Sequence, residues 1–167
     1  MIQTILFATD MGLHTPYLLH HVNTLALQHG ARVIVLHAIE PPGSLGNAVV
    51  YSYGRSETQA ERTGGIDYVI RGVKSRIVDM LEDEFIDGQV GLSRIRDVRV
   101  VAGKPVDVIL GQAGECNADM IIMGSHGQGT DSPNLLGSVT SRVLQLSRVP
   151  VYMVPLVRNL GHQARAG

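Results

Sequence analysis

The sequence predicts an α/β protein with an open sheet of five parallel strands, in the order 3-2-1-4-5, and helices on both faces. Three observations support this prediction: short apolar runs recur along the chain, segments of helical periodicity lie between them, and 167 residues suit one compact domain. Strands that alternate with helices pair in parallel through right-handed crossovers, and the helices then cover both faces of the sheet.

The first half of the chain predicts two strands, a helix and a long loop. Residues 2–9 form a short apolar run that ends at turn-forming residues, which predicts the first strand. Residues 16–30 have apolar positions at helical spacing, with proline in the first turn and glycine at the end. Residues 32–39 are rich in β-branched side chains and predict the second strand. Residues 41–65 show no sustained periodicity, so we expect a long loop, of the kind that forms a lid or stays disordered.

The second half predicts three more strands and three more helices, within one domain that spans residues 1–157. The strands are predicted over residues 94–101, 120–123 and 149–154. The helices are predicted over residues 66–81, from Gly103-Lys104-Pro105 onward, and from Gly137-Ser138 onward. Residues 158–167 contain little core-forming sequence, so we expect a flexible C-terminal tail.

The composition is that of an ordinary soluble globular protein. Hydrophobic residues make up 44% of the chain and charged residues 17%, and the net charge is −1. This balance gives no broad basic field for nucleic acid, and the sequence contains neither an apolar run of membrane-spanning length nor an export signal. Cys116 is the one cysteine, which excludes an intrachain disulfide and predicts a buried apolar thiol in a protein of the reducing cytoplasm.

A glycine-spaced loop is the strongest indication of chemistry. Gly124-Ser125-His126-Gly127 follows the fourth predicted strand, and Gly137-Ser138 opens the last predicted helix. Glycine permits positive φ and the close approach of a ligand, while a helix N-terminus offers free N–H groups and the positive end of its dipole to a phosphate. The alternative is a glycine-rich turn in which Ser138 only caps the helix.

The position of this loop in the predicted sheet favours ligand binding. In a 3-2-1-4-5 sheet, ligands bind beyond the carboxyl ends of strands one and four, where the winding direction reverses. Asp10 and Gly124 end these two strands. Asp10 has the alternative role of a turn residue or a helix-capping carboxylate.

The glycine pattern resembles the signature of the universal stress protein family, which is Gly, two residues, Gly, nine residues, Gly, then Ser or Thr. Here the pattern comprises Gly124, Gly127, Gly137 and Ser138. The resemblance extends over nearly the whole chain, through the segments ILFATD, VLHAIE, ADMIIMGSHG and LLGSVTSRVLQLSRVPVYMVP. It implies a Rossmann-like fold of the adenine nucleotide alpha hydrolase type. It also implies a stress-response or signalling protein that changes conformation or partners when it binds ATP.

By the same resemblance, the chain holds ATP, ADP or AMP, with Mg²⁺ or Mn²⁺ as an accompanying ion. The region of the base and ribose comprises Ala8, Thr9, Asp10, Ala38 and Met123. The region of the ribose and phosphates comprises Gly124, His126 and Gly127, and the terminal phosphates lie at Gly137, Ser138 and Val139. Met123 has the alternative role of an apolar wall residue.

The sequence offers little fixed positive charge to phosphate. No lysine or arginine lies between Gly127 and Gly137, so phosphate charge falls on the helix end and a divalent ion. Asp131 either lies near that ion or repels phosphate, and the choice between ATP and AMP stays open. No histidine pair at i, i+4 has a supporting carboxylate, so we predict no metal site made by the protein alone. His37 either lies beside the base or packs against a helix.

The sequence is compatible with three functions. The leading one is nucleotide-dependent signalling, with enzymatic activity absent or limited to slow ATP hydrolysis, because no Walker loop or Ser/His/Asp arrangement is present. The second is a nucleotide-independent homodimeric adaptor, in which residues 149–154 pair with a second copy at the sheet edge. The third is phosphoryl or nucleotidyl transfer, which only fold analogy supports. Tyr51 and Tyr53, in the long loop, either stack on a ligand or partner or pack locally.

Overall fold

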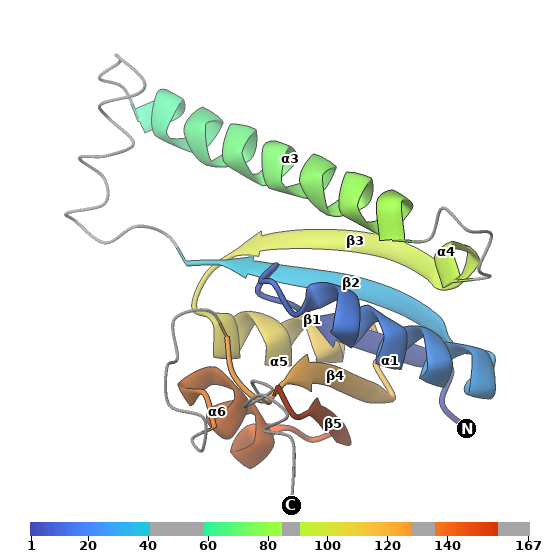
Figure 1. The fold of residues 1–167 in the computed structure, drawn as a ribbon. Coiled ribbons are helices and arrows are strands. Elements are labelled where there is room, and N and C mark those ends of the chain that lie inside the picture. Colours follow the sequence, from blue (N-terminus) through green and yellow to red (C-terminus); the bar gives the residue numbers. More distant parts are fainter. Residues whose placement is uncertain (41–58, 85–90, 128–135, 157–167) are drawn as a thin grey trace, which may run out of the picture.

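The computed structural model describes residues 1–40, 59–84, 91–127 and 136–156. Its five strands are parallel and follow the order β3-β2-β1-β4-β5, which confirms the predicted topology (Figure 1). The strands are β1 (Thr4–Ala8), β2 (Arg32–Ile39), β3 (Ile95–Ala102), β4 (Met120–Gly124) and β5 (Val151–Val154). The helices are α1 (Thr15–His29), α3 (Gln59–Glu84), α4 (Gly91–Arg94), α5 (Pro105–Glu115) and α6 (Ser138–Leu146).

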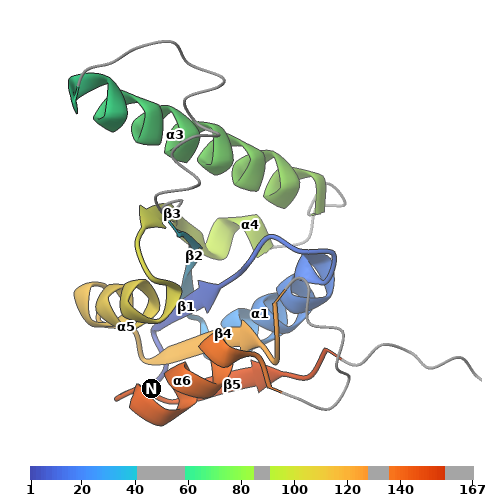
Figure 2. The same ribbon diagram turned by 90° about the vertical axis from the view of Figure 1, so that its left-hand side faces the viewer.

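The two faces of the sheet carry separate apolar cores. Along β1, Ile5 and Phe7 belong to the core under α1 and α3, whereas Leu6 and Ala8 belong to the core under α5 and α6. Figure 2 shows α1 and α5 on opposite sides of the sheet. Every residue of β1 is buried, as expected for a central parallel strand that helices cover on both faces.

The predicted start and end signals of the first helix correspond to α1. Pro16 lies in its first turn, and Gly30 follows its last residue with φ +64°, a left-handed conformation that glycine adopts without strain. Arg94 Nη1 donates to the Gly30 carbonyl at 3.1 Å. This contact ties the turn after α1 to α4, a helix so short that apolar periodicity could not predict it.

α3 begins at Gln59, earlier than the sequence predicted. The expected loop over residues 41–65 is therefore wrong for residues 59–65, which are helical, and residues 41–58 lie outside the described residues. Gly64 and Gly65 misled the prediction, because each glycine costs a helix about 1 kcal/mol relative to alanine. Helix formation is cooperative, however, and the later turns of α3 bury Ile77 and Leu81 in the core over the sheet.

β5 begins at Val151, later than the predicted residue 149. Ser147 Oγ donates to the Val149 carbonyl at 2.7 Å and accepts the Val149 N–H at 3.2 Å. These local bonds engage the backbone of Val149 in a turn, so the strand begins only after Pro150. The predicted C-terminal tail, residues 158–167, lies outside the described residues.

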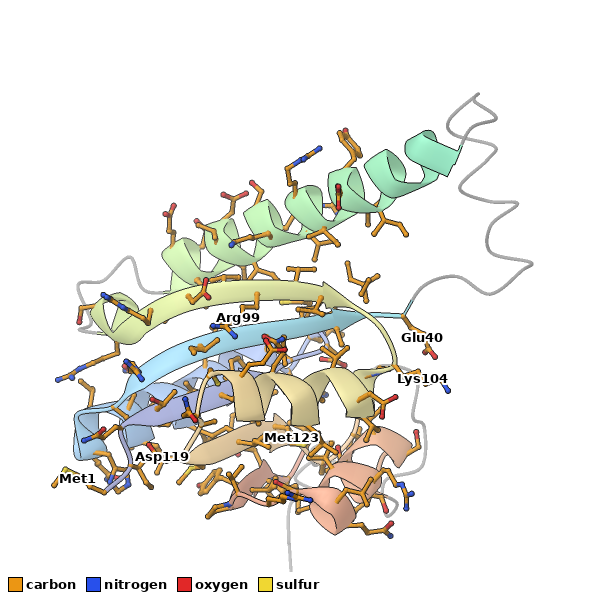
Figure 3. The ribbon with its side chains drawn as sticks, turned by 180° about the vertical axis from the view of Figure 1, so that it is seen from behind. Met1, Glu40, Arg99, Lys104, Asp119 and Met123 are labelled. Atoms are coloured by element: carbon orange, nitrogen blue, oxygen red, sulfur yellow. The ribbon has the colours of Figure 1, made fainter. Side chains whose placement is uncertain are left out.

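Asp119, which precedes β4, holds the beginning of β1. Its Oδ2 accepts the N–H of Gln3 at 2.8 Å and the N–H of Thr4 at 2.9 Å, and these hydrogen bonds lower the pKa of Asp119. Figure 3 shows Asp119 near Met1, at the end of the sheet opposite Glu40. Polar contacts thus hold the amino ends of the central strands together, and the candidate site lies at their carboxyl ends.

Candidate functional site

A cavity of about 280 Å³ opens at the carboxyl end of the sheet. Its wall includes residues from the ends of β1, β2 and β4 and from the first turns of α5 and α6. Glu40 and Lys104 mark this end of the sheet in Figure 3. The cavity therefore lies where the strand order alone places a ligand, beyond the carboxyl ends of strands one and four.

Every residue of the site predicted from the sequence lines this cavity. These residues are Ala8, Thr9, Asp10, Ala38, Met123, Gly124, His126, Gly127, Gly137, Ser138 and Val139. His37, which had two possible roles, also lines it. The wall residues that sequence reasoning missed are Leu18, Leu36, Pro105, Ile109 and Thr140. Apolar periodicity marks some of these as core, but it does not tell which core residues face a cavity.

Other atoms lie close to each of the three signature glycines. A Cβ added at Gly127 would be 3.2 Å from Asp10 Oδ2, and one added at Gly137 would be 3.0 Å from His126 Cα. A Cβ at Gly124 would be 2.7 Å from Leu156 Cδ1. Positive φ, the other use of glycine expected from the sequence, does not occur at these positions. Among the described glycines it occurs at Gly30 and Gly103. The nearest atom is backbone at Gly137 and the end of a side chain at Gly124 and Gly127, so close packing restricts Gly137 most, and none of the three needs glycine for its φ.

The N-terminus of α6 forms one end of the cavity. The Gly137 N–H donates to the Ser125 carbonyl at 2.9 Å, and Thr140 Oγ1 donates to the Gly124 carbonyl at 2.9 Å, so both contacts fix the helix to the end of β4. Gly137 is the N-cap, and Ser138 is the first residue of the helix. The alternative role of Ser138 as a helix cap is therefore wrong. The first-turn N–H groups have no acceptor within their own helix, which leaves them suited to an anion.

Asp10 forms the turn that was one of its two possible roles. Its Oδ1 accepts the Gly12 N–H at 3.0 Å, which makes a tight turn after β1. The side chain is exposed and lines the cavity, and its Oδ2 lies on the side of Gly127. A turn residue at this position can therefore also face a ligand.

Two histidines in the wall are held through their Nδ1 atoms. His37 Nδ1 lies 2.8 Å from the Thr9 carbonyl, which joins the ends of β2 and β1. His126 Nδ1 lies 3.0 Å from Ser125 Oγ, and the same hydroxyl accepts the Leu156 N–H at 2.9 Å. Both rings are thus fixed by neighbouring polar groups.

The described wall carries few charges. Its titratable side chains are Asp10, His37 and His126, and its described residues include no lysine or arginine. Across the described part of the chain, no group of three or more His, Cys, Asp or Glu side chains lies together as a metal site. A polyphosphate in this cavity would therefore rely on helix N–H groups and on an ion that arrives with it.

Cys116 lies outside the cavity wall and is buried at the end of α5, as predicted. Burial raises the pKa of its thiol, which disfavours the reactive thiolate. The described helices include none with the length and hydropathy that crossing a membrane requires.

Comparison with known proteins agrees with this fold. A model of the Universal stress protein family matches residues 1–155. A universal stress protein of Thermus aquaticus is 29% identical over 156 residues, which cover 92% of this chain and 99% of that protein. Universal stress protein MJ0577 of Methanocaldococcus jannaschii is 28% identical over 158 residues, which cover 92% of this chain and 95% of that protein.

Solved structures show the same architecture. The structure of MJ0577 superposes with a TM-score of 0.67 at 28% identity, and covers 95% of this chain and 99% of its own. A universal stress protein in complex with cAMP superposes with a TM-score of 0.52 at 22% identity, and covers 92% of this chain and 97% of its own. With the family model matching almost the full length and the signature glycines in place, this chain belongs to the universal stress protein family.

Proposed function

We propose that this protein binds an adenine nucleotide, with ATP as the leading ligand, and acts in stress response or signalling. The observation that supports this most is the convergence of the signature glycines, Asp10 and the first turn of α6 on one cavity. Such cavities, with a mainly apolar lining and a few polar groups, are the usual form of small-molecule sites.

The apolar part of the wall suits the adenine ring. Leu36 and Ala38 from β2, Met123 from β4 and Ile109 from α5 line it. A flat aromatic base gains free energy when such side chains remove its faces from water. His37 lies in the same wall, with Nδ1 bonded to the Thr9 carbonyl.

The polar part of the wall suits phosphate. Ser138 and Val139 begin α6, so their N–H groups belong to the positive end of the helix dipole. Mg²⁺ or Mn²⁺ bound with ATP would take its ligands from phosphate oxygens and water, and Asp10 is the carboxylate in the described wall that could join them. The ion would neutralise phosphate charge that the wall does not balance.

The proposed output is a change of surface and not a chemical product. A ligand that contacts both Gly127 and Gly137 ties the end of β4 to the start of α6. It thereby changes the surface that this part of the protein presents to a protein partner. A lone, buried cysteine is consistent with a cytoplasmic location.

Calorimetric titration of the native protein with ATP, ADP, AMP, adenosine and cAMP, each with and without Mg²⁺, tests the proposal. Saturable heat with at least one phosphate-bearing adenine ligand is the expected result. Mass spectrometry of any small molecule that copurifies with the protein identifies the ligand directly. No saturable heat with the whole series, together with an empty purified protein, would reject nucleotide binding.

The edge strand β5 favours a second candidate, a homodimeric adaptor. The Pro150 carbonyl accepts the N–H of Ile121 in β4, and the Val154 carbonyl accepts the N–H of Ser125, which follows β4. Successive residues of a strand direct their N–H and C=O groups to opposite sides. Those of Val151 and Met153 therefore point away from β4, toward the free edge of the sheet. Tyr152 is exposed on this strand, and its ring lies 6.2 Å from that of His21 on α1. A second copy could therefore pair with this edge and cover Tyr152. Sedimentation that shows only monomer at micromolar concentration would reject the dimer.

Catalysis on the nucleotide is proposed only as slow ATP hydrolysis. Asp10 is the carboxylate in the described wall, and one exposed carboxylate offers a weak means to orient water. Multiple-turnover release of ADP that disappears in Asp10→Ala would show an activity beyond binding. Phosphoryl or nucleotidyl transfer would require a product other than ADP in the same assay.

A further inference from the structure

The described cavity wall can gain positive charge only by protonation. Its titratable side chains are one carboxylate, Asp10, and two imidazoles, His37 and His126. A phosphate-bearing ligand therefore meets one carboxylate and two imidazoles, and imidazole is the side-chain type that can change its charge between acid and neutral pH. The bonds of the two rings determine what each ring offers to a ligand before and after protonation.

The Thr9 carbonyl determines which nitrogen of His37 carries a hydrogen. A carbonyl oxygen only accepts hydrogen bonds, so His37 Nδ1 carries a hydrogen and donates it to the Thr9 carbonyl at 2.8 Å. In the neutral ring, Nε2 is then a hydrogen-bond acceptor, which suits an amino group of a ligand. Protonation of Nε2 would remove that acceptor, so acid does not improve this contact.

His126 is bonded in a way that fits both protonation states. Its Nδ1 lies 3.0 Å from Ser125 Oγ, which also accepts the Leu156 N–H at 2.9 Å. The Ser125 hydroxyl can donate to a neutral Nδ1, or it can turn and accept an Nδ1–H through its second lone pair. Nε2 carries a hydrogen in both cases. The ring can therefore gain a proton without moving and without losing a bond.

The position of His126 places that charge at the phosphate end of the cavity. A Cβ on Gly137, the N-cap of α6, would be 3.0 Å from His126 Cα and 3.3 Å from His126 Cβ, so His126 packs against the start of the helix. The titratable groups of the described wall that lie on other elements are Asp10, which approaches Gly127 from the end of β1, and His37 at the end of β2. An anion bound between α6 and His126 would stabilise the imidazolium by direct Coulomb attraction.

We propose that ligand binding is coupled to proton uptake at His126, so a phosphate-bearing adenine nucleotide binds more tightly as the pH falls through the imidazole range. The proton comes from solvent and adds to Nδ1, while the Ser125 hydroxyl hydrogen turns to another acceptor. This inference rests on the proposed nucleotide function and adds its regulation. If saturation moves the titration midpoint of the ring by one pH unit, affinity changes by up to tenfold between the deprotonated and protonated states.

Titration of the histidine Cε1–H resonances by NMR tests the coupling in the full chain. The spectra are recorded between about pH 5 and pH 8.5, without ligand and with saturating ATP, and His126→Gln assigns the resonance. The expected result is an upward move of the His126 midpoint by about one pH unit with ATP. Because the imidazole itself is observed, the titration of the phosphate groups does not interfere. Adenosine, which lacks phosphate, should move the midpoint much less than ATP.

Matched variants separate the possible failures. His20→Gln, on the exposed face of α1 and outside the cavity wall, should leave the pH dependence of ATP affinity unchanged, whereas His126→Gln should weaken it to the part that comes from the phosphate groups of ATP. Saturable ligand shifts with an unmoved or lowered His126 midpoint would overturn the coupling while nucleotide binding stands. A pH dependence that is unchanged in His126→Gln and weakened in His37→Gln would also overturn it. No saturable shift with ATP, AMP or cAMP would reject the proposed function, and the coupling with it.

Discussion

The Asp10 carboxylate lies against Gly127 across the mouth of the cavity, so that a Cβ on Gly127 would be 3.2 Å from Asp10 Oδ2 and 4.0 Å from Asp10 Cβ. This contact joins the end of β1 to the glycine loop after β4. It connects the two features from which the site was predicted, the topological switch point and the glycine spacing. The missing side chain of Gly127 keeps the cavity open beside Asp10.

Substitution of Gly127 tests that relationship. In Gly127→Val, the added methyl groups must displace the Asp10 side chain or enter the cavity, so we expect nucleotide affinity to fall at least tenfold. Gly111→Val is the matched control, because a Cβ at Gly111 meets nothing within 4 Å. Calorimetric titration measures affinity and circular dichroism checks the fold. Equal affinities of the two folded variants would show that Gly127 does not border the ligand.

Thr140 provides a test of how α6 is held. Its buried Oγ1 donates to the Gly124 carbonyl at 2.9 Å, and Thr140→Val keeps the shape but removes the donor. We expect a loss of about 1–2 kcal/mol in the free energy of unfolding by urea, because the carbonyl loses its partner. Thr24→Val, on an exposed turn of α1, should cost less than about 0.5 kcal/mol. A smaller loss at position 140 than at position 24 would contradict this account.

The lowered pKa of Asp119 predicts that part of the free energy of unfolding is lost in acid. Hydrogen bonds from the Gln3 and Thr4 N–H groups lower the pKa of Asp119 in the folded state. A carboxyl whose pKa is lowered by folding stabilises the folded state. This stabilisation is complete above the pKa of the unfolded state, about 3.9, and is lost as the pH falls through the lower pKa of the folded state. Asp119→Asn should therefore be less stable than the native protein at pH 7, and the difference should shrink in acid.

Urea midpoints of both proteins at several pH values below 7 provide that measurement. Asp67→Asn, on an exposed part of α3, is the control for the general effect of removing a carboxylate. A native-minus-variant difference that stays constant down to the lowest pH would show that the charge of Asp119 does not stabilise the start of β1.

Met153→Pro tests whether β5 pairs with a second copy. The Met153 N–H points away from β4 by strand alternation, so proline removes a donor from the free edge and leaves the ladder to β4 intact. If the protein is a dimer through this edge, the variant should sediment as a folded monomer. A folded variant that remains dimeric would place the dimer contact elsewhere on the surface.

Strand order and the cavity could be predicted because they follow from short-range signals. β1 and β4 are short, mainly apolar runs; Asp10 lies two residues after β1, and Gly124 ends β4. Parallel winding then leaves little choice of where the two ends meet. The glycine spacing predicted the loop that follows β4. Its physical role was only partly foreseen, because close contacts such as that of Gly137 with His126 arise between segments that no local pattern relates.

The start of α3 could not be predicted for the opposite reason. Residues 59–65 carry glycines and no apolar stripe of their own, and they are helical as an extension of turns that bury Ile77 and Leu81. Likewise, Leu36 and Ile109 looked like any core residues, and only the packing of β2 against α5 turns them toward the cavity.

Amide mapping with ATP tests whether the nucleotide binds at the cavity wall. In ¹H–¹⁵N spectra of the native protein, we expect ATP with Mg²⁺ to cause no comparable shifts along β5 and saturable amide shifts at Gly124, Gly127, Gly137, Ser138 and Val139. An absence of saturable shifts, or shifts confined to residues outside the cavity wall, would contradict it.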